Sequence, residues 1–176
     1  QNGLERVEND YFIIDSRRTS SGEGAALPAE TDADKFGTVG AVALDQDGNL
    51  AAGTSTGGIS NKRFGRIGDS PMIGAGTYAS NESVAVSATG QGEFYIRSVA
   101  AHNVAARVRH GDAPLQEAAR AAVEEAEALG GVGGLIVLDP DGNMAMPFTT
   151  TGMFRAYVTP DGTIKARIFK ENEGDM

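Results

Sequence analysis

The chain has no cysteine and only two histidines, His102 and His110, among its 176 residues. The absence of cysteine excludes disulfide bonds, thiolate catalysis and cysteine-based zinc sites. Two histidines supply neither a histidine-rich metal site nor a Ser-His-Asp triad readily, so a hydrolase of this composition must find its general base elsewhere. We therefore expect no metal and no cofactor. Since no disulfide indicates an oxidising compartment, we expect a cytoplasmic protein.

Positive charge and long apolar runs are scarce as well. The 15 lysines and arginines are outnumbered by 24 aspartates and glutamates, which gives a formal net charge of -9. Because phosphate binding needs a basic surface, neither nucleic acid nor an anionic membrane is an expected partner. No apolar stretch is long enough to cross a bilayer, and no signal-peptide pattern opens the chain.

What remains is the composition of an ordinary globular domain, with 40% hydrophobic and 22% charged residues. The length suits one domain with a hydrophobic core. Because the first residue is Gln1 rather than Met, we expect a processed or trimmed chain.

The pattern of apolar residues predicts strands, then two helices, then strands again. The helices are expected at 93–110 and 114–129. The expected strands are 38–45, 50–56, 77–80, 83–89, 133–139, 143–148, 154–158 and 163–169. This order indicates a mixed, largely antiparallel sheet with its helices grouped together, rather than alternating parallel βαβ units. The turns DQDGN and DPDGN suit hairpins.

The junction at Thr38 is the most unusual local feature. Residues 20–37 have the composition of a mobile linker, and a buried-strand pattern begins at Thr38. In self-cleavage the Thr38 hydroxyl would attack the carbonyl of the residue before it. That residue is Gly37, and glycine tolerates the distorted backbone that such an attack requires. Cleavage would leave Thr38 with an α-amine of pKa roughly 7.7–8.0, which can act as a general base. The ordinary alternative is a loop that runs into a strand.

Four motifs follow one another from this junction: TVGAV from Thr38, TSTGG from Thr54, GRIGDSP from Gly65 and TGQGE from Thr89. At these spacings they resemble the isoaspartyl peptidase/L-asparaginase family of threonine N-terminal-nucleophile hydrolases. The match is at motif level from 37 to 92 and looser to about Phe154.

This resemblance implies an αββα sandwich, in which two sheets lie between helix layers. Residues 1–37 would be the tail of a preceding subunit and a linker, with a short helix or strand at 4–14. Residues 38–176 would be the catalytic domain. Most of the preceding segment of the family fold is expected to be missing from this chain.

The resemblance also implies the catalytic residues. Thr38 matches the nucleophile, and the bond between Gly37 and Thr38 matches the cleavage site. Thr56 matches the residue that tunes the nucleophilic hydroxyl. Thr89 and Gly90 match an oxyanion hole made of a hydroxyl and a backbone N–H group. From the pattern alone, Thr56 could equally be a hydroxyl on a half-exposed strand, and Thr89 a helix N-cap.

Substrate contacts are implied for Arg66, Asp69, Gly90 and Gly92. An amino-acid head group needs one cation and one anion a few ångströms apart, and arginine can grip both oxygens of a carboxylate. Arg66 matches the anchor for the α-carboxylate, and Asp69 matches the partner of the α-ammonium. Gly92 matches a carbonyl that helps to hold the ammonium. The ordinary alternative is a solvated ion pair at the surface.

The function implied is a self-processing amidohydrolase that cleaves L-asparagine and β-aspartyl (isoaspartyl) dipeptides through a threonyl acyl-enzyme. Its expected partners are the small-molecule substrate and the missing N-terminal α-subunit segment, in an (αβ)2 assembly. One alternative is a glycosylasparaginase, which shares much of the GRIGDSP region. Another is a non-catalytic fragment or assembly subunit that binds amino acids.

Overall fold

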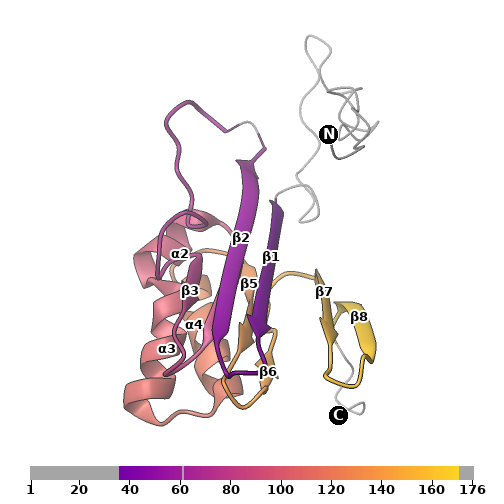
Figure 1. Ribbon diagram of the computed structural model, residues 1–176. Helices are drawn as coiled ribbons and strands as arrows, with labels where there is room; N and C mark the ends of the chain where they lie inside the picture. The colour runs from indigo at the N-terminus through magenta and orange to yellow at the C-terminus, as the bar shows by residue number, and fades with distance from the viewer. Residues whose placement is uncertain (1–35, 61, 171–176) are drawn as a thin grey trace. The chain divides into compact units, whose positions relative to one another are not determined.

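The computed structural model describes residues 36–60 and 62–170 (Figure 1). The elements are β1 (Phe36–Leu44), β2 (Leu50–Ile59), β3 (Thr77–Ala79), β4 (Ala85–Gly90), α2 (Gly92–Ser98), α3 (Ala100–Gly111), α4 (Leu115–Ala128), β5 (Gly133–Leu138), β6 (Met144–Ala145), β7 (Gly152–Val158) and β8 (Ile164–Phe169). The expected order of strands, helices and strands is confirmed, and the fold is mixed α/β. The element expected at 4–14 and the linker up to residue 35 lie outside the described residues.

Strands β1 and β2 form the antiparallel hairpin that the sequence predicts. The Asp45 carboxylate closes its turn by accepting hydrogen bonds from the backbone N–H groups of Asp47 (2.9 Å) and Asn49 (2.7 Å). This turn sets the pairing of the two strands, because a one-residue slip would turn every side chain to the opposite face. In the observed register Thr38 lies opposite Thr56.

The central sheet has the strand order β3-β4-β5-β6, and all of its pairs are antiparallel. Helices α3 and α4 pack on it, and the β1–β2 hairpin packs against β4 and β5 (Figure 1). The core is largely alanine and valine, which lets the helices approach the sheet closely. Its fully buried large side chains are Tyr95, Leu135, Val84, Val86, Val104, Val123 and Val137. The longest described helix, α4, has 14 residues, which is too few to span a bilayer.

The helix expected at 93–110 is wrong as a single element, because Val99 breaks it into α2 and α3. Val99 has φ 48°, a left-handed conformation that β-branched residues rarely adopt. The break frees N–H groups at the start of α3 for a bond outside the helix: the Ala101 N–H donates to the Ala75 carbonyl at 3.1 Å. Apolar periodicity continues across such a break and does not reveal it.

Two strand boundaries also differ from expectation. Strand β1 begins at Phe36 rather than Thr38, because Phe36 still pairs with Ile59. The return strand expected at 143–148 shrinks to β6. It ends before Pro147, which has no N–H group for a strand ladder, although the Pro147 carbonyl still accepts a hydrogen bond from the Leu135 N–H at 2.9 Å.

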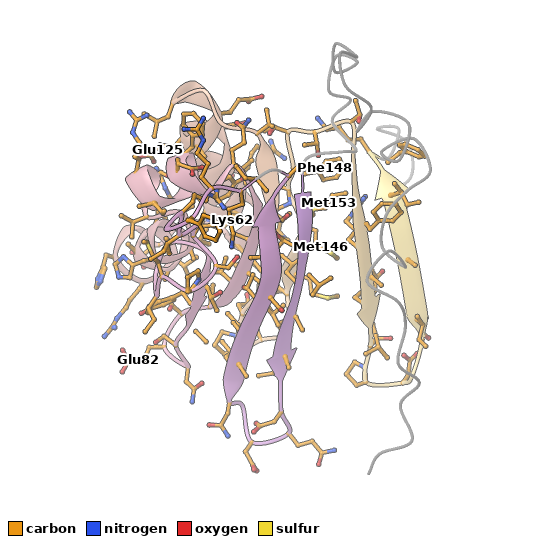
Figure 2. The ribbon with its side chains drawn as sticks, turned by 90° about the horizontal axis from the view of Figure 1, so that it is seen from above. Lys62, Glu82, Glu125, Met146, Phe148 and Met153 are labelled. Atoms are coloured by element: carbon orange, nitrogen blue, oxygen red, sulfur yellow. The ribbon has the colours of Figure 1, made fainter. Side chains whose placement is uncertain are left out.

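Strands β7 and β8 form the last hairpin, which is also confirmed. A groove of about 670 Å³ lies between β7 and β1, and its floor comes from β5. Figure 2 shows Met146, Phe148 and Met153 in the space between β1 and β7. In the described chain, β1 is paired with β2 alone and β7 with β8 alone. Each strand therefore has a free edge.

Leu135 provides a test of the core. We expect Leu135→Ala to lower the free energy of unfolding by about 2–5 kcal/mol, because it removes a fully buried side chain from the middle of the central sheet. Urea denaturation measures the change. Ile164→Ala, at a position 74% exposed in β8, is the control and should stay within about 0.5 kcal/mol of the wild type. Equal losses in the two variants would contradict this description of the core.

Candidate active site

Two threonine hydroxyls meet across the β1–β2 pair. The Thr38 hydroxyl donates a hydrogen bond to Thr56 Oγ1 at 3.1 Å, and the Gly58 N–H donates to the same oxygen at 2.9 Å. The second bond orients the Thr56 hydroxyl independently of Thr38. Just before Thr38 the strand pairing is irregular, between Phe36 and Thr38. The bond between Gly37 and Thr38 therefore lies where the strand departs from regular geometry.

The third expected threonine, Thr89, lies near the end of β4. The end of β1 that carries Thr38 lies toward this end of β4, because the opposite half of β1 shares the groove with the far half of β5. Figure 1 agrees: α2, which follows β4, lies level with the upper half of the hairpin, the half in which β1 begins and β2 ends. Thr89 is no helix N-cap, since the N-cap of α2 is Gln91. Within the described ranges, the Thr89 hydroxyl has no hydrogen-bond partner and is available to a ligand.

Gly90 follows Thr89 in a conformation that only glycine adopts easily. Its φ is 143°, and a β-carbon there would lie 2.4 Å from the Val132 carbonyl oxygen. The backbone at Thr89 and Gly90 is thus held against the start of β5 by close packing. Such packing provides the fixed geometry that an N–H donor to an oxyanion needs.

Arg66, Asp69 and Gly92 form a second cluster. A β-carbon at position 92 would lie 2.7 Å from Asp69 Oδ1 and 3.2 Å from Arg66 Nη2. The cation and the anion therefore converge on a backbone position without a side chain. Two opposite charges beside an open backbone match the two charges of an amino-acid head group.

Asp69 is buried, with 6% of its surface exposed, and its Oδ2 atom has no hydrogen-bond partner in the described structure. Burial raises the pKa of this carboxyl, while backbone N–H groups and Arg66 oppose that shift. A buried carboxylate with an unsatisfied oxygen is costly, and a cationic group bound beside the carboxylate would offset its negative charge. Among the described residues, the Tyr95 hydroxyl is the other buried side-chain oxygen without a hydrogen-bond partner, and burial raises its pKa as well.

A chain of hydroxyls connects the two clusters. Thr54 and Ser87 share a hydrogen bond of 2.6 Å, and the Thr77 hydroxyl donates to Thr54 at 2.5 Å. The Thr54 hydroxyl also reaches the Gly76 carbonyl at 3.3 Å, and a β-carbon at Gly76 would lie 2.8 Å from Asp69 Oδ2. Strand β2, which carries Thr56, is thereby tied to the loop that carries Asp69.

Sequence reasoning did not assign Glu93 and this hydroxyl chain. Glu93 accepts two hydrogen bonds from Arg66, to Oε1 at 2.9 Å and to Oε2 at 3.1 Å. Glu93 is the last residue of the TGQGE motif, but the motif does not indicate that its carboxylate pairs with Arg66. The alternation of Thr54 with Thr56 was the available signal for the hydroxyl chain. Its other members come from segments far apart in sequence.

Neither a histidine nor a metal-binding group is part of these clusters in the described structure. His102, on α3, makes an edge-on contact with the Tyr78 ring at 5.3 Å between centroids. In the described part of the chain, no group of three or more His, Cys, Asp or Glu side chains is arranged to hold a metal ion.

The comparisons with known proteins agree with the motifs. The sequence profile described as Asparaginase matches residues 3–168, and the chain therefore belongs to this asparaginase family. It is 49% identical to the isoaspartyl peptidase of Escherichia coli (strain K12) over 183 residues, which cover 98% of this chain. It is 46% identical to the isoaspartyl peptidase/L-asparaginase of Bos taurus over 156 residues, which cover 86% of this chain.

The matched regions are shorter than those relatives. The match covers 57% of the Escherichia coli protein and 50% of the Bos taurus protein. The chain is 39% identical to the isoaspartyl peptidase/L-asparaginase of Danio rerio over 154 residues, which cover 86% of this chain. That match covers 50% of the Danio rerio protein. The chain thus spans about half the length of these curated relatives.

Burial of Asp69 leads to a prediction about stability. We expect Asp69→Asn to raise the melting temperature of the unliganded protein at neutral pH, because it removes a buried charge. The Asp69 pKa is raised in the folded state, so the charge destabilises the fold fully above that pKa and not at all below the unfolded pKa near 3.9. The gain should therefore shrink as the pH falls through this window.

Thermal melts of both proteins from pH 7 to pH 3.5 measure this difference. Asp141→Asn, at an exposed position in the turn before β6, is the control and should show no such gain at neutral pH. A variant less stable than the wild type at pH 7 would mean that Arg66 and the backbone already compensate the charge of Asp69.

Proposed function

We propose that the protein is an amidohydrolase that uses Thr38 to cleave the side-chain amide of L-asparagine and the β-aspartyl bond of isoaspartyl dipeptides. The observation that carries this proposal is the 3.1 Å hydrogen bond from the Thr38 hydroxyl to Thr56. It connects the hydroxyl at the proposed cleavage site to a second, independently oriented hydroxyl. Family membership and the names of the relatives support the choice of reaction.

Activation would begin with cleavage of the bond between Gly37 and Thr38. The Thr38 hydroxyl attacks the Gly37 carbonyl carbon, the peptide C–N bond breaks, and water hydrolyses the resulting ester. Gly37 then ends in a carboxylate, and Thr38 carries an α-amine beside its own hydroxyl. The absence of a β-carbon at Gly37 and the irregular pairing before Thr38 support such an attack.

The hydrolysis would follow as acyl transfer to Thr38. Its amine takes the hydroxyl proton while Oγ1 attacks the side-chain amide carbon of the substrate. The Thr89 hydroxyl and the Gly90 N–H donate to the tetrahedral oxyanion. The proton on the amine passes to the departing nitrogen, which leaves as ammonia or as a peptide amine. Water then cleaves the ester and releases aspartate.

Arg66, Asp69 and Gly92 would hold the substrate by its head group. Arg66 receives the α-carboxylate, and Asp69 receives the α-ammonium through Oδ1, the oxygen that lies beside Gly92. The Gly92 carbonyl adds a second acceptor for the ammonium. With both α-groups held, the reacting amide must belong to the side chain, which distinguishes β-aspartyl bonds from ordinary peptide bonds.

We also propose that the complete fold is an αββα sandwich, to which a preceding α-subunit segment contributes. The described helices pack on the central sheet, and the outward residues Val39, Ala41 and Ala43 of β1 are exposed. The groove between β1 and β7 has two free strand edges. A strand in this groove would satisfy both edges, and helices beyond it would cover the outward face. We expect two such αβ units in the assembly, with 38–176 as the catalytic part of each.

Replacement of the proposed nucleophile tests the reaction. We expect Thr38→Ala to remain uncut between residues 37 and 38 and to lose more than about 10⁴-fold in kcat for ammonia release from asparagine. N-terminal sequencing and intact mass measure the cleavage, and the wild type should show a new terminus beginning Thr-Val-Gly-Ala-Val.

Ser55→Ala, which removes a hydroxyl from the exposed face of β2, is the matched control and should be cut and active. Cleavage of the Thr38→Ala chain would exclude the self-processing step. Wild-type activity on a glycosylated asparagine but not on a β-aspartyl dipeptide would identify a glycosylasparaginase instead.

The groove gives a prediction about the preceding segment. We expect Val42→Lys to release this segment from the processed protein, because a charge would be buried where Val42 lines the groove. Size-exclusion chromatography followed by gel electrophoresis measures the fraction retained. Gln116→Lys, on the exposed face of α4, introduces the same charge away from the groove and should retain the segment. Full retention in Val42→Lys would place the segment elsewhere.

A further inference from the structure

Glu93 holds Arg66 in a two-point clamp. One carboxylate oxygen accepts from Arg66 Nε at 2.9 Å and the other from Nη2 at 3.1 Å. This is the bidentate geometry in which a guanidinium and a carboxylate fix each other's orientation. Glu93 is the second residue of α2, next to Gly92, so the clamp is anchored beside the proposed head-group site.

The clamp uses one edge of the guanidinium and leaves another free. A guanidinium has five N–H donors, and Glu93 occupies one on Nε and one on Nη2. The edge between Nη1 and Nη2 has no other partner in the described structure. Its two ends face glycines, because a β-carbon at Gly68 would lie 2.9 Å from Nη1 and one at Gly92 would lie 3.2 Å from Nη2. Neither glycine carries a side chain that would block this edge.

The Arg66–Glu93 pair differs from the other described ion pairs. Arg107 pairs with Glu125, and Arg109 with Glu82, and both partners of each pair are 40% exposed or more. The Arg66 side chain is only 16% exposed, while Glu93 is 54% exposed. Among these three arginines, Arg66 is the one withdrawn from water and aimed inward.

We propose that Glu93 is a positioning residue that sets the orientation of Arg66, so that its free edge selects substrates with an α-carboxylate. This inference rests on the proposed function and adds a specificity-determining residue to the same site. Without the clamp, the long arginine side chain would lose the single orientation that presents this edge. The negative charge of Glu93 also repels the incoming carboxylate. Water at the exposed glutamate screens that repulsion. We therefore expect the orientation of Arg66 to affect substrate binding more than the repulsion does.

The charge state of the clamp is steady over the working pH range. The hydrogen bonds from Arg66 lower the pKa of Glu93, and those same bonds raise the pKa of Arg66. Burial raises the pKa of Asp69, which is the opposite direction to the shift of Glu93. Effects of Glu93 substitution on KM should persist from neutral pH down to the range where Asp69 titrates.

The test compares two substrates in the native, processed protein. For Glu93→Gln we expect the KM for L-asparagine to rise about 10- to 100-fold with kcat within about twofold, as for a lost hydrogen bond to a charged group. The KM for L-asparaginamide, in which an amide replaces the α-carboxylate, should stay unchanged. A purely structural role would change both substrates alike and lower kcat. An unchanged or lower KM for asparagine would overturn the proposal.

Glu82→Gln is the matched control, because it removes the glutamate of the Arg109 ion pair and leaves Arg66 untouched. Figure 2 shows Glu82 and Glu125 well apart from each other. Glu82→Gln should match the wild type with both substrates. A change in the control equal to that in Glu93→Gln would also overturn the proposal.

Calorimetry with L-aspartate separates this inference from the proposed reaction. If the wild type turns over neither asparagine nor a β-aspartyl dipeptide, the proposed function fails. Weaker aspartate binding by Glu93→Gln than by the wild type would still support the positioning role. Equal affinities, or no binding of aspartate to the wild type, would overturn it.

Discussion

The antiparallel register of β1 and β2 is the constraint on which the site depends. It places Thr38 opposite Thr56, and their hydroxyls then lie 3.1 Å apart. A slip of one residue between the strands would place the two hydroxyls on opposite faces of the hairpin. The Asp45 turn closes the hairpin at one end, and the hydroxyl chain ties the middle of β2, at Thr54, to β3 and β4.

The same hydroxyl chain explains how two clusters become one candidate site. Thr54 reaches the carbonyl of Gly76, and a β-carbon at Gly76 would lie 2.8 Å from Asp69 Oδ2. The threonine pair and the charged pair therefore share one rigid support, although no direct contact joins them. Asp69 is kept as an unsatisfied buried carboxylate, a feature that destabilises the empty protein and is typical of a site that awaits a cation.

Much of the architecture could be predicted from local patterns. Hairpins were predicted where DQDGN and DPDGN turns separate apolar runs, and the family was recognised from four motifs. The break at Val99 could not be predicted, because it depends on carbonyl oxygens of the segment before β3 that accept hydrogen bonds at the start of α3. The short β6 follows from Pro147, a signal that was present but was outweighed by the apolar pattern around it.

The sequence by itself determined which residue types are available: a threonine after a glycine, an arginine and an aspartate three apart, and almost no histidine. Their spacing also showed the family. Only the tertiary structure decided that Asp69 is buried with one oxygen unsatisfied, and that Glu93 holds one edge of Arg66 and leaves another free. Burial and hydrogen-bond geometry depend on segments far apart in the chain, and no local pattern contains them.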